Sequence, residues 1–182
     1  MHWKNGINLP MPANIEIKAR IHNAAAFKSL AESLGDAAAA TFRQEDIFFR
    51  VPHGRLKLRI LAPDSGQLIF YTRPDTAGPK RSEYRIYETS RPDELGPVLS
   101  SVLEVRGTVR KTRSLYLVGQ TRIHLDDVET LGTFAELEVV LRPGQSDAEG
   151  LAVAENLLAK LGIHPDDLIK GAYIDLMEQP SL

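Results

Sequence analysis

Asn14-Ile15-Glu16-Ile17-Lys18 shows the pattern that decides the fold of this chain. Polar and charged residues alternate with isoleucine, as in a β-strand whose successive side chains point to opposite faces of a sheet. Four later segments repeat the alternation, with formal charge on nearly the whole polar face: 55–60, 111–113, 122–126 and 136–141. Five such strands predict a sheet with one apolar face and one charged face.

Turn residues divide most of the remaining sequence into further short strands. The predicted strands lie near residues 14–21, 43–50, 55–61, 67–73, 81–88, 108–118, 121–128 and 134–141. Asp64-Ser65-Gly66 and Gly119-Gln120 suit tight turns between neighbouring strands. Many strands joined by short turns indicate a mainly antiparallel sheet or a barrel.

Three segments have the 3.6-residue period of amphipathic helices: 23–34, 91–105 and 146–161. The third is the strongest, because Ser146 and Glu149 form a capping box. Helices that cover the apolar face from outside leave the charged face for the interior. A barrel with a charged lumen is therefore favoured over a solvent-exposed sheet face with salt bridges. The predicted fold class is α+β, an eight-stranded antiparallel β tunnel (closed barrel) with flanking helices.

Composition excludes several classes of protein. The 182 residues suit one domain, taken as residues 14–182 after an N-terminal arm at 1–13. The net charge of −2 argues against a dedicated nucleic-acid binder, and the lack of cysteine excludes disulfides and thiolate chemistry. No apolar run reaches the length of a membrane span, and the first residues lack the apolar core of a signal peptide. A cytoplasmic protein without a membrane partner is expected.

The charged face contains both carboxylates and cations. Its carboxylates are Glu16, Asp126, Glu136 and Glu138, and its cations are Lys18, Arg55, Lys57, Arg59, Lys111, Arg113 and Arg122. Carboxylates two residues apart on a strand repel each other, and a hard divalent cation such as Mg²⁺ or Mn²⁺ relieves this repulsion. Clustered lysines and arginines suit a polyanion. A metal ion and a polyanion in one cavity indicate phosphoryl or nucleotidyl transfer.

An ordered set of motifs resembles the CYTH superfamily, also called triphosphate tunnel metalloenzymes. Residues 14–18 resemble its N-terminal ExExK signature, and further matches lie at 53–59, 110–116, 121–126, 131–138 and 171–176. The family includes class IV adenylyl cyclases, thiamine triphosphatases and inorganic triphosphatases. Residues 53–59 and 115–119 look most like class IV cyclases. The resemblance implies an eight-stranded antiparallel tunnel and a metal-dependent enzyme.

The resemblance also implies residue roles. Metal ligands for Mg²⁺ or Mn²⁺ are expected at Glu16, Asp126, Glu136 and Glu138. Matching positions imply phosphate contacts from Lys18, Lys57, Arg59, Lys111 and Arg113. Strand alternation adds Arg122 and Arg81. The strand that ends at Arg73 lacks a lysine that family members often carry before a Gly-Pro, and Arg73 or Lys80 is expected to replace it. The catalytic residues are then expected to be Glu16, Lys18, Lys111 and Glu136.

Three positions depart from the family pattern or leave alternatives open. Asn14 stands where the first glutamate of ExExK is expected, and an uncharged amide should weaken one metal site. His124 is a ligand, a proton shuttle or a hydrogen-bonded lumen residue, and the last is favoured. Tyr173 packs in the core or closes one tunnel mouth, and packing is favoured.

Three functions follow from this interpretation. A class IV adenylyl cyclase-like enzyme would convert ATP to cyclic AMP and pyrophosphate. A triphosphatase would release orthophosphate from inorganic or thiamine triphosphate. A non-catalytic module would hold a triphosphate or another polyanion without turnover. The expected partners are a nucleoside triphosphate, thiamine triphosphate or inorganic triphosphate, without nucleic acid, and the frequent dimers of the family allow for a homodimer.

Overall fold

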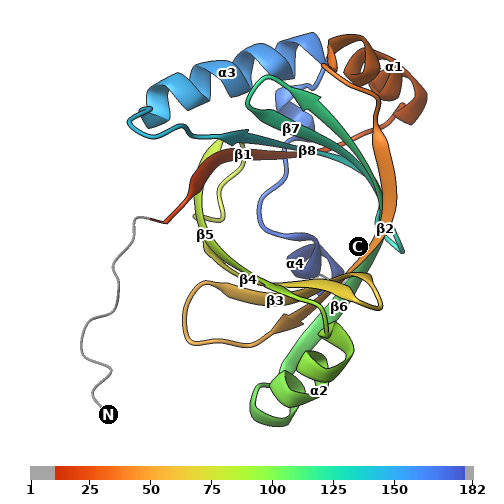
Figure 1. Ribbon diagram of the computed structural model, residues 1–182. Helices are drawn as coiled ribbons and strands as arrows, with labels where there is room; N and C mark the ends of the chain where they lie inside the picture. The colour runs from red at the N-terminus through yellow and green to blue at the C-terminus, as the bar shows by residue number, and fades with distance from the viewer. Residues whose placement is uncertain (1–10, 179–182) are drawn as a thin grey trace.

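Eight antiparallel strands close into a barrel in the computed structural model, which describes residues 11–178 (Figure 1). The strands are β1 (Ala13–Arg20), β2 (Ala40–Phe49), β3 (Arg55–Ala62), β4 (Ser65–Thr72), β5 (Lys80–Thr89), β6 (Val105–Val118), β7 (Thr121–Val128) and β8 (Gly132–Val140). Around the barrel the order is β1-β5-β4-β3-β2-β6-β7-β8, with antiparallel pairing throughout. The predicted α+β barrel is confirmed, and each of the eight predicted segments forms a strand.

The register between β1 and β8 shows how the alternating sequence fills the barrel. Glu16 lies opposite Glu138, and Lys18 lies opposite Glu136. All four side chains line the interior, so their apolar neighbours point outward. The outer side chains join one large core cluster that includes Ile15, Ile17, Ile123, Leu137 and Val139. The charged lumen therefore follows from the period-2 alternation once the outer face is buried.

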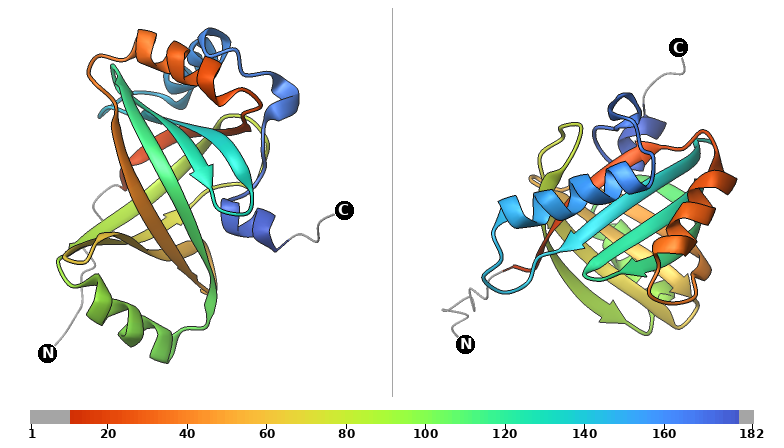
Figure 2. Two further views of the ribbon diagram at one scale, coloured as in Figure 1. Left: turned by 90° about the vertical axis from the view of Figure 1, so that its right-hand side faces the viewer. Right: turned by 90° about the horizontal axis from the view of Figure 1, so that it is seen from above.

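Three helices cover the outside of the barrel: α1 (Ala24–Leu34), α2 (Pro92–Val102) and α3 (Asp147–Lys160). Helices α1 and α3 lie over the wall that contains β1, β6, β7 and β8 (Figure 2). Helix α3 begins with the predicted Ser146–Glu149 capping box, and the Asn23 side chain caps α1 through the Ala26 N–H. In the described part of the chain, no helix has the length and hydropathy needed to span a membrane.

The C-terminal segment closes one end of the barrel. After a short 3-10 helix (Pro165–Asp167), the chain runs along β1 and forms helix α4 (Tyr173–Met177). Ala172, Tyr173 and Ile174 pack against apolar side chains from β2, β6, β7 and β8. Asp175 binds Arg55 at 2.8 Å and Arg106 at 2.6 Å, which fixes this segment to the wall. The predicted N-terminal arm lies largely outside the described residues, and Ala13 already belongs to β1.

Candidate functional site: a charged tunnel with an acidic and a basic wall

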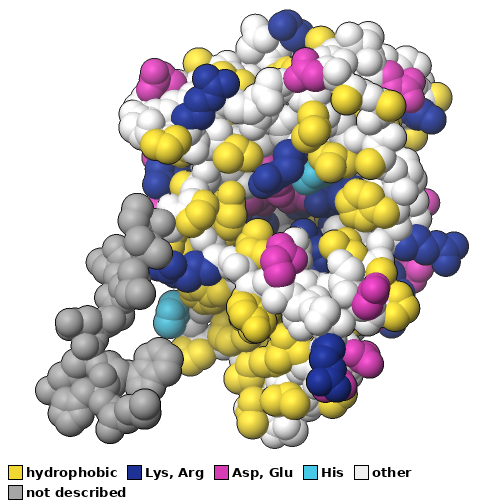
Figure 3. All heavy atoms as spheres, viewed as in Figure 1, with side chains coloured by type: hydrophobic (Ala, Val, Ile, Leu, Met, Phe, Trp, Pro, Cys, Tyr) yellow, Lys and Arg dark blue, Asp and Glu magenta, His cyan; other side chains and the backbone are white. Residues whose placement is uncertain are grey.

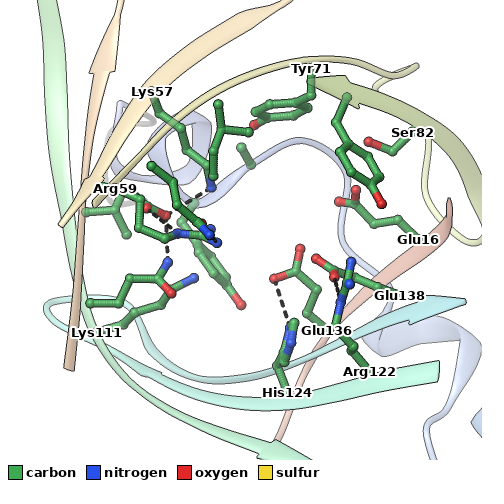
Figure 4. A pocket seen from close by; sticks show the side chains of 18 of the residues that line it. Glu16, Lys57, Arg59, Tyr71, Ser82, Lys111, Arg122, His124, Glu136 and Glu138 are labelled. Carbon is green, nitrogen blue, oxygen red and sulfur yellow. Dashed lines mark hydrogen bonds and ion pairs between the residues drawn. The ribbon is translucent and has the colours of Figure 1, made fainter. Parts of the chain in front are cut away.

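A cavity of about 310 Å³ occupies the barrel and is lined by side chains from all eight strands and from the C-terminal segment. On the face shown in Figure 3, charged side chains lie inside a hollow that is bordered by hydrophobic ones. The close view separates the charged groups into two sides (Figure 4). Carboxylates of β1 and β8 lie on one side, and lysines and arginines of β3 and β6 lie on the other.

The acidic wall is formed by Glu16, Glu136 and Glu138. Lys18 binds Glu136 at 3.1 Å, and Arg122 binds Glu138 at 2.7 Å. Burial would raise the pKa of Glu136, but Lys18 and Arg113 bring it well below its usual range. Burial raises the pKa of Glu16, although Arg73 opposes this. Glu16 faces Glu138 directly across the strands, and two facing carboxylates destabilise a sheet unless a cation compensates them.

The basic wall is formed by Lys57, Arg59 and Lys111. Lys57 and Arg59 each bind the buried Asp46 at 3.0 Å. Burial would raise the pKa of Asp46, but Arg59 and Lys57 hold it well below its usual range. Burial and the neighbouring Arg113 lower the pKa of Lys111 to about 7. The wall therefore holds cations that can exchange carboxylate partners for phosphate oxygens.

The position of Asp126 does not fit its predicted role as a metal ligand. Both of its oxygens accept hydrogen bonds from Arg113 at 2.6 Å, and Oδ2 also accepts from Lys111 at 3.2 Å and from the Tyr173 hydroxyl at 2.9 Å. The side chain has no exposed surface, and neither Asp126 nor Arg113 lines the cavity. This ion pair joins β6, β7 and the C-terminal segment, so the geometry favours a structural role for both residues.

Arg73 and Lys80 lie at the closed end. Arg73 forms an ion pair with Glu16 and donates a hydrogen bond to the carbonyl oxygen of Gly171. Lys80 donates to the carbonyl of Thr76 at 2.9 Å and does not line the cavity. Of the two candidates for the missing lysine, Arg73 is therefore the one in the tunnel.

Arg81 does not enter the tunnel, and the predicted phosphate contact does not fit its position. Its side chain is 41% exposed and forms ion pairs with Glu83 and Asp147. Arg81 pairs with Ile15 across the strands, whereas its neighbour Ser82 pairs with Asn14 and lines the cavity. The prediction was wrong by one residue of register, which exchanges the two faces of a strand.

His124 differs from the favoured interpretation, whereas Tyr173 packs in the core as expected. His124 is 3% exposed and lines the cavity, but its Nδ1 has no hydrogen-bond partner among the described residues. Burial and Arg113 lower the pKa of His124, which favours the neutral ring. Tyr173 packs against Phe134, as expected, and it also lines the cavity, with Lys18 Nζ 3.8 Å from the ring centroid.

The other end of the tunnel has an apolar border. Phe42, Leu61, Ile86 and Leu115 line the cavity where β2 begins, β3 and β5 end and β6 approaches its hairpin. Leu61 and Ile86 are 37% and 46% exposed. The amide of Gln67 and the guanidinium of Arg122 lie among these residues in the lining. This end offers apolar surface to the outer part of a ligand whose anionic part lies deeper.

Sequence reasoning missed several lining residues, chiefly Gln44, Asp46, Tyr71 and Tyr84. Gln44 and Asp46 lie on one face of β2, and Arg43 and Glu45 lie on the other. All four residues are polar, so the sequence does not show which face points into the barrel. The tyrosines resemble ordinary core residues in a strand, and only the closed barrel shows that they face a cavity.

The residues present fit a divalent cation. One ligand atom from each of His124, Glu136 and Glu138 lies within 4.8 Å of the other two. Carboxylate and imidazole groups are common ligands of divalent ions in proteins. Of the predicted ligands, Glu136 and Glu138 belong to this cluster, and Glu16 faces Glu138 while it is paired with Arg73. The acidic wall is therefore the part of the tunnel that could hold a metal ion.

Comparison with solved structures identifies the same barrel in other proteins. The PH1012 protein of Pyrococcus horikoshii OT3 is 24% identical, with a TM-score of 0.79 over 90% of this chain and 98% of that one. A Vibrio parahaemolyticus protein described as a candidate adenylate cyclase is 20% identical, with a TM-score of 0.77 over 94% and 100%. HpAC1 of Hippeastrum, described as having a dominant triphosphatase activity, is 18% identical, with a TM-score of 0.59 over 87% and 91%.

The family comparison covers most of the chain. No curated protein matches significantly. The CYTH domain model matches residues 12–173, from the start of β1 to the first residue of α4. This range contains all eight strands and every residue of the two tunnel walls, and the chain therefore belongs to the CYTH domain family.

Proposed function

We propose that the protein is a divalent-metal-dependent enzyme that cleaves a nucleoside triphosphate inside the tunnel, as a class IV adenylyl cyclase does. The observation that carries this proposal is the division of one cavity into an acidic and a basic wall. A metal ion on the acidic wall would supply a Lewis acid for phosphate oxygens. The basic wall would hold the rest of the phosphate chain and offset its charge.

The two ends of the tunnel support one orientation of the substrate. The C-terminal segment closes one end with Tyr173, and the other end is bordered by apolar side chains. The triphosphate would enter first, with Lys57, Arg59 and Lys111 on its oxygens. The base and ribose would then lie near Phe42 and Leu115. In ATP the α-phosphorus is the phosphorus nearest the ribose, and attack of the 3′-hydroxyl on it would form cyclic AMP and release pyrophosphate.

A triphosphatase is the second candidate, because the same two walls would serve attack by water at the terminal phosphorus. The open-end border favours a triphosphate that carries an organic group over inorganic triphosphate. The charged walls alone favour neither reaction, because both reactions develop negative charge on the phosphate chain.

Separation of products tests the proposal. The protein is incubated with ATP, thiamine triphosphate or inorganic triphosphate, each with Mg²⁺ or Mn²⁺. Cyclic AMP and pyrophosphate from ATP are the expected products. Orthophosphate would replace the cyclase proposal by the triphosphatase one. Binding of triphosphate without any product would leave a binding module and would overturn the enzymatic proposal.

A further inference from the structure

His124 is the feature of the tunnel that the proposed reaction leaves unexplained. It belongs to β7 and lies directly opposite Glu136 on β8. Its side chain is 3% exposed and points into the cavity beside the acidic wall (Figure 4). The Nδ1 atom has no hydrogen-bond partner among the described residues. A buried polar atom without a partner costs free energy, so its retention at this place needs a reason.

Glu136 is too far from His124 Nδ1 to form a hydrogen bond with it. The distance from His124 Nδ1 to Glu136 Oε2 is 3.9 Å, which is too long for a hydrogen bond. It suits two ligands of one ion, because ligands about 2.1 Å from a metal lie about 3 to 4 Å from each other. One ligand atom from each of His124, Glu136 and Glu138 lies within 4.8 Å of the other two.

The two carboxylates of the cluster keep lone pairs for a metal ion although each has a cationic partner. Arg113 binds Glu136 Oε2 at 2.6 Å, Lys18 binds Oε1 at 3.1 Å, and Arg122 binds Glu138 Oε2 at 2.7 Å. A carboxylate oxygen has two lone pairs and can accept a hydrogen bond while it ligates a metal. Glu16 faces Glu138 across the strands and forms an ion pair with Arg73.

We propose that His124, Glu136 and Glu138 form a site of mixed nitrogen and oxygen donors that prefers a divalent transition-metal ion to Mg²⁺. The inference names the ion of the acidic wall and rests on the proposed function only for the role of that ion in turnover. Asn14, which also lines the cavity, has a buried Oδ1 that lacks a hydrogen-bond partner among the described residues.

The chemistry of the donors determines the preference. Mg²⁺ binds oxygen ligands and retains several waters. An imidazole nitrogen suits later divalent ions, and affinities for a given site generally rise from Mn²⁺ to Cu²⁺. We therefore expect Mn²⁺ to bind the protein without any triphosphate, at least about 10-fold more tightly than Mg²⁺. Replacement of His124 by glutamine should reduce this ratio, because glutamine offers an oxygen.

Pulsed electron paramagnetic resonance of the Mn²⁺-loaded protein tests histidine ligation without any turnover. The expected spectrum has modulation from a coordinated ¹⁴N, and labelling with ¹⁵N-histidine should change it in the otherwise unaltered protein. His124→Gln should abolish the modulation and weaken Mn²⁺ binding about 10-fold or more. His164→Gln is the matched control, because that ring is 68% exposed and lies outside the tunnel. Circular dichroism confirms that both variants are folded.

Three results would overturn the site: Mn²⁺ does not bind at millimolar concentration, the modulation does not respond to ¹⁵N-histidine, or it persists in His124→Gln. The product assay separates this inference from the proposed function. Histidine ligation without any product would retain the metal site and remove the enzymatic proposal. Product formation without histidine ligation would retain the enzymatic proposal and remove the metal site at His124.

Discussion

Glu136 on β8 lies beside titratable side chains from three other strands of the barrel. It lies beside Lys18, Arg113 and His124 and belongs to the candidate metal cluster. Glu136→Gln retains the shape and removes the charge, so kcat/KM for ATP should fall about 100-fold or more. Steady-state kinetics measure this, with the outer-face variant Glu83→Gln as control. An unchanged rate would exclude Glu136 from the site.

Lys111 should make stability depend on pH. Its pKa in the folded protein is about 7, below the usual 10.5, so between these values the unfolded chain binds more protons. The free energy of unfolding should therefore rise from pH 7 to pH 9, by about 1 kcal/mol per pH unit from this group. Urea titrations should show a smaller slope for Lys111→Met than for wild type or Lys28→Met, whose lysine is exposed. Equal slopes in all three proteins would contradict the low pKa of Lys111.

Phe42 tests the orientation of the substrate. It lies in the apolar border of the open end, where the base of ATP is proposed to bind. Phe42→Ala should raise KM for ATP about 5-fold or more, because apolar contact area is lost, and it should leave KM for inorganic triphosphate nearly unchanged. Tyr87→Ala, on the outer face and 68% exposed in wild type, is the control. An equal rise for both substrates would place the base elsewhere.

At the scale of elements, α3 is held on the barrel by a close approach at Gly150. A Cβ atom there would lie 2.5 Å from Leu141 Cδ2 and 2.8 Å from Ile15 Cγ1. Alanine normally stabilises a helix by about 1 kcal/mol over glycine, but overpacking at such distances costs about 1–3 kcal/mol. Gly150→Ala should therefore destabilise the protein in urea titrations.

Gly96 in α2 provides the matched comparison for this prediction. The nearest atom to a Cβ there is Leu58 Cδ2 at 3.4 Å, which is an ordinary contact. Gly96→Ala should therefore be neutral or stabilising by up to about 1 kcal/mol. If Gly150→Ala is as neutral or stabilising as Gly96→Ala, the contact of α3 with β1 is less close than described.

The elements also show what local sequence could and could not predict. All eight strands and the three long helices were predictable, because each combines a period with turn or cap residues. Helix α4 was not, since five residues are too few to show a helical period. Arg81 was placed on the wrong face, because Lys80, Arg81 and Ser82 are all polar. The sequence there does not show which residues point into the barrel.

At the scale of the molecule, the charged lumen was predictable and the division of its charges was not. Alternation shows that Glu136 and Lys57 face inward, but only the strand order places β8 and β3 on different sides of the cavity. Asp126 accepts a hydrogen bond from Tyr173, which is 47 residues away along the chain, and local sequence does not show such a contact. Closure of one end by the C-terminal segment is likewise a property of the assembled barrel.

Calorimetric titration with α,β-methylene-ATP and Mn²⁺ tests most directly whether the tunnel is the triphosphate site. The account predicts one molecule bound per chain, with an affinity about 10–100-fold lower in Lys57→Met, because a charged hydrogen bond from the basic wall is lost. Lys28→Met, on the outer surface of α1, should bind as wild type does. Absence of binding, or equal affinity in all three proteins, would contradict the central claim.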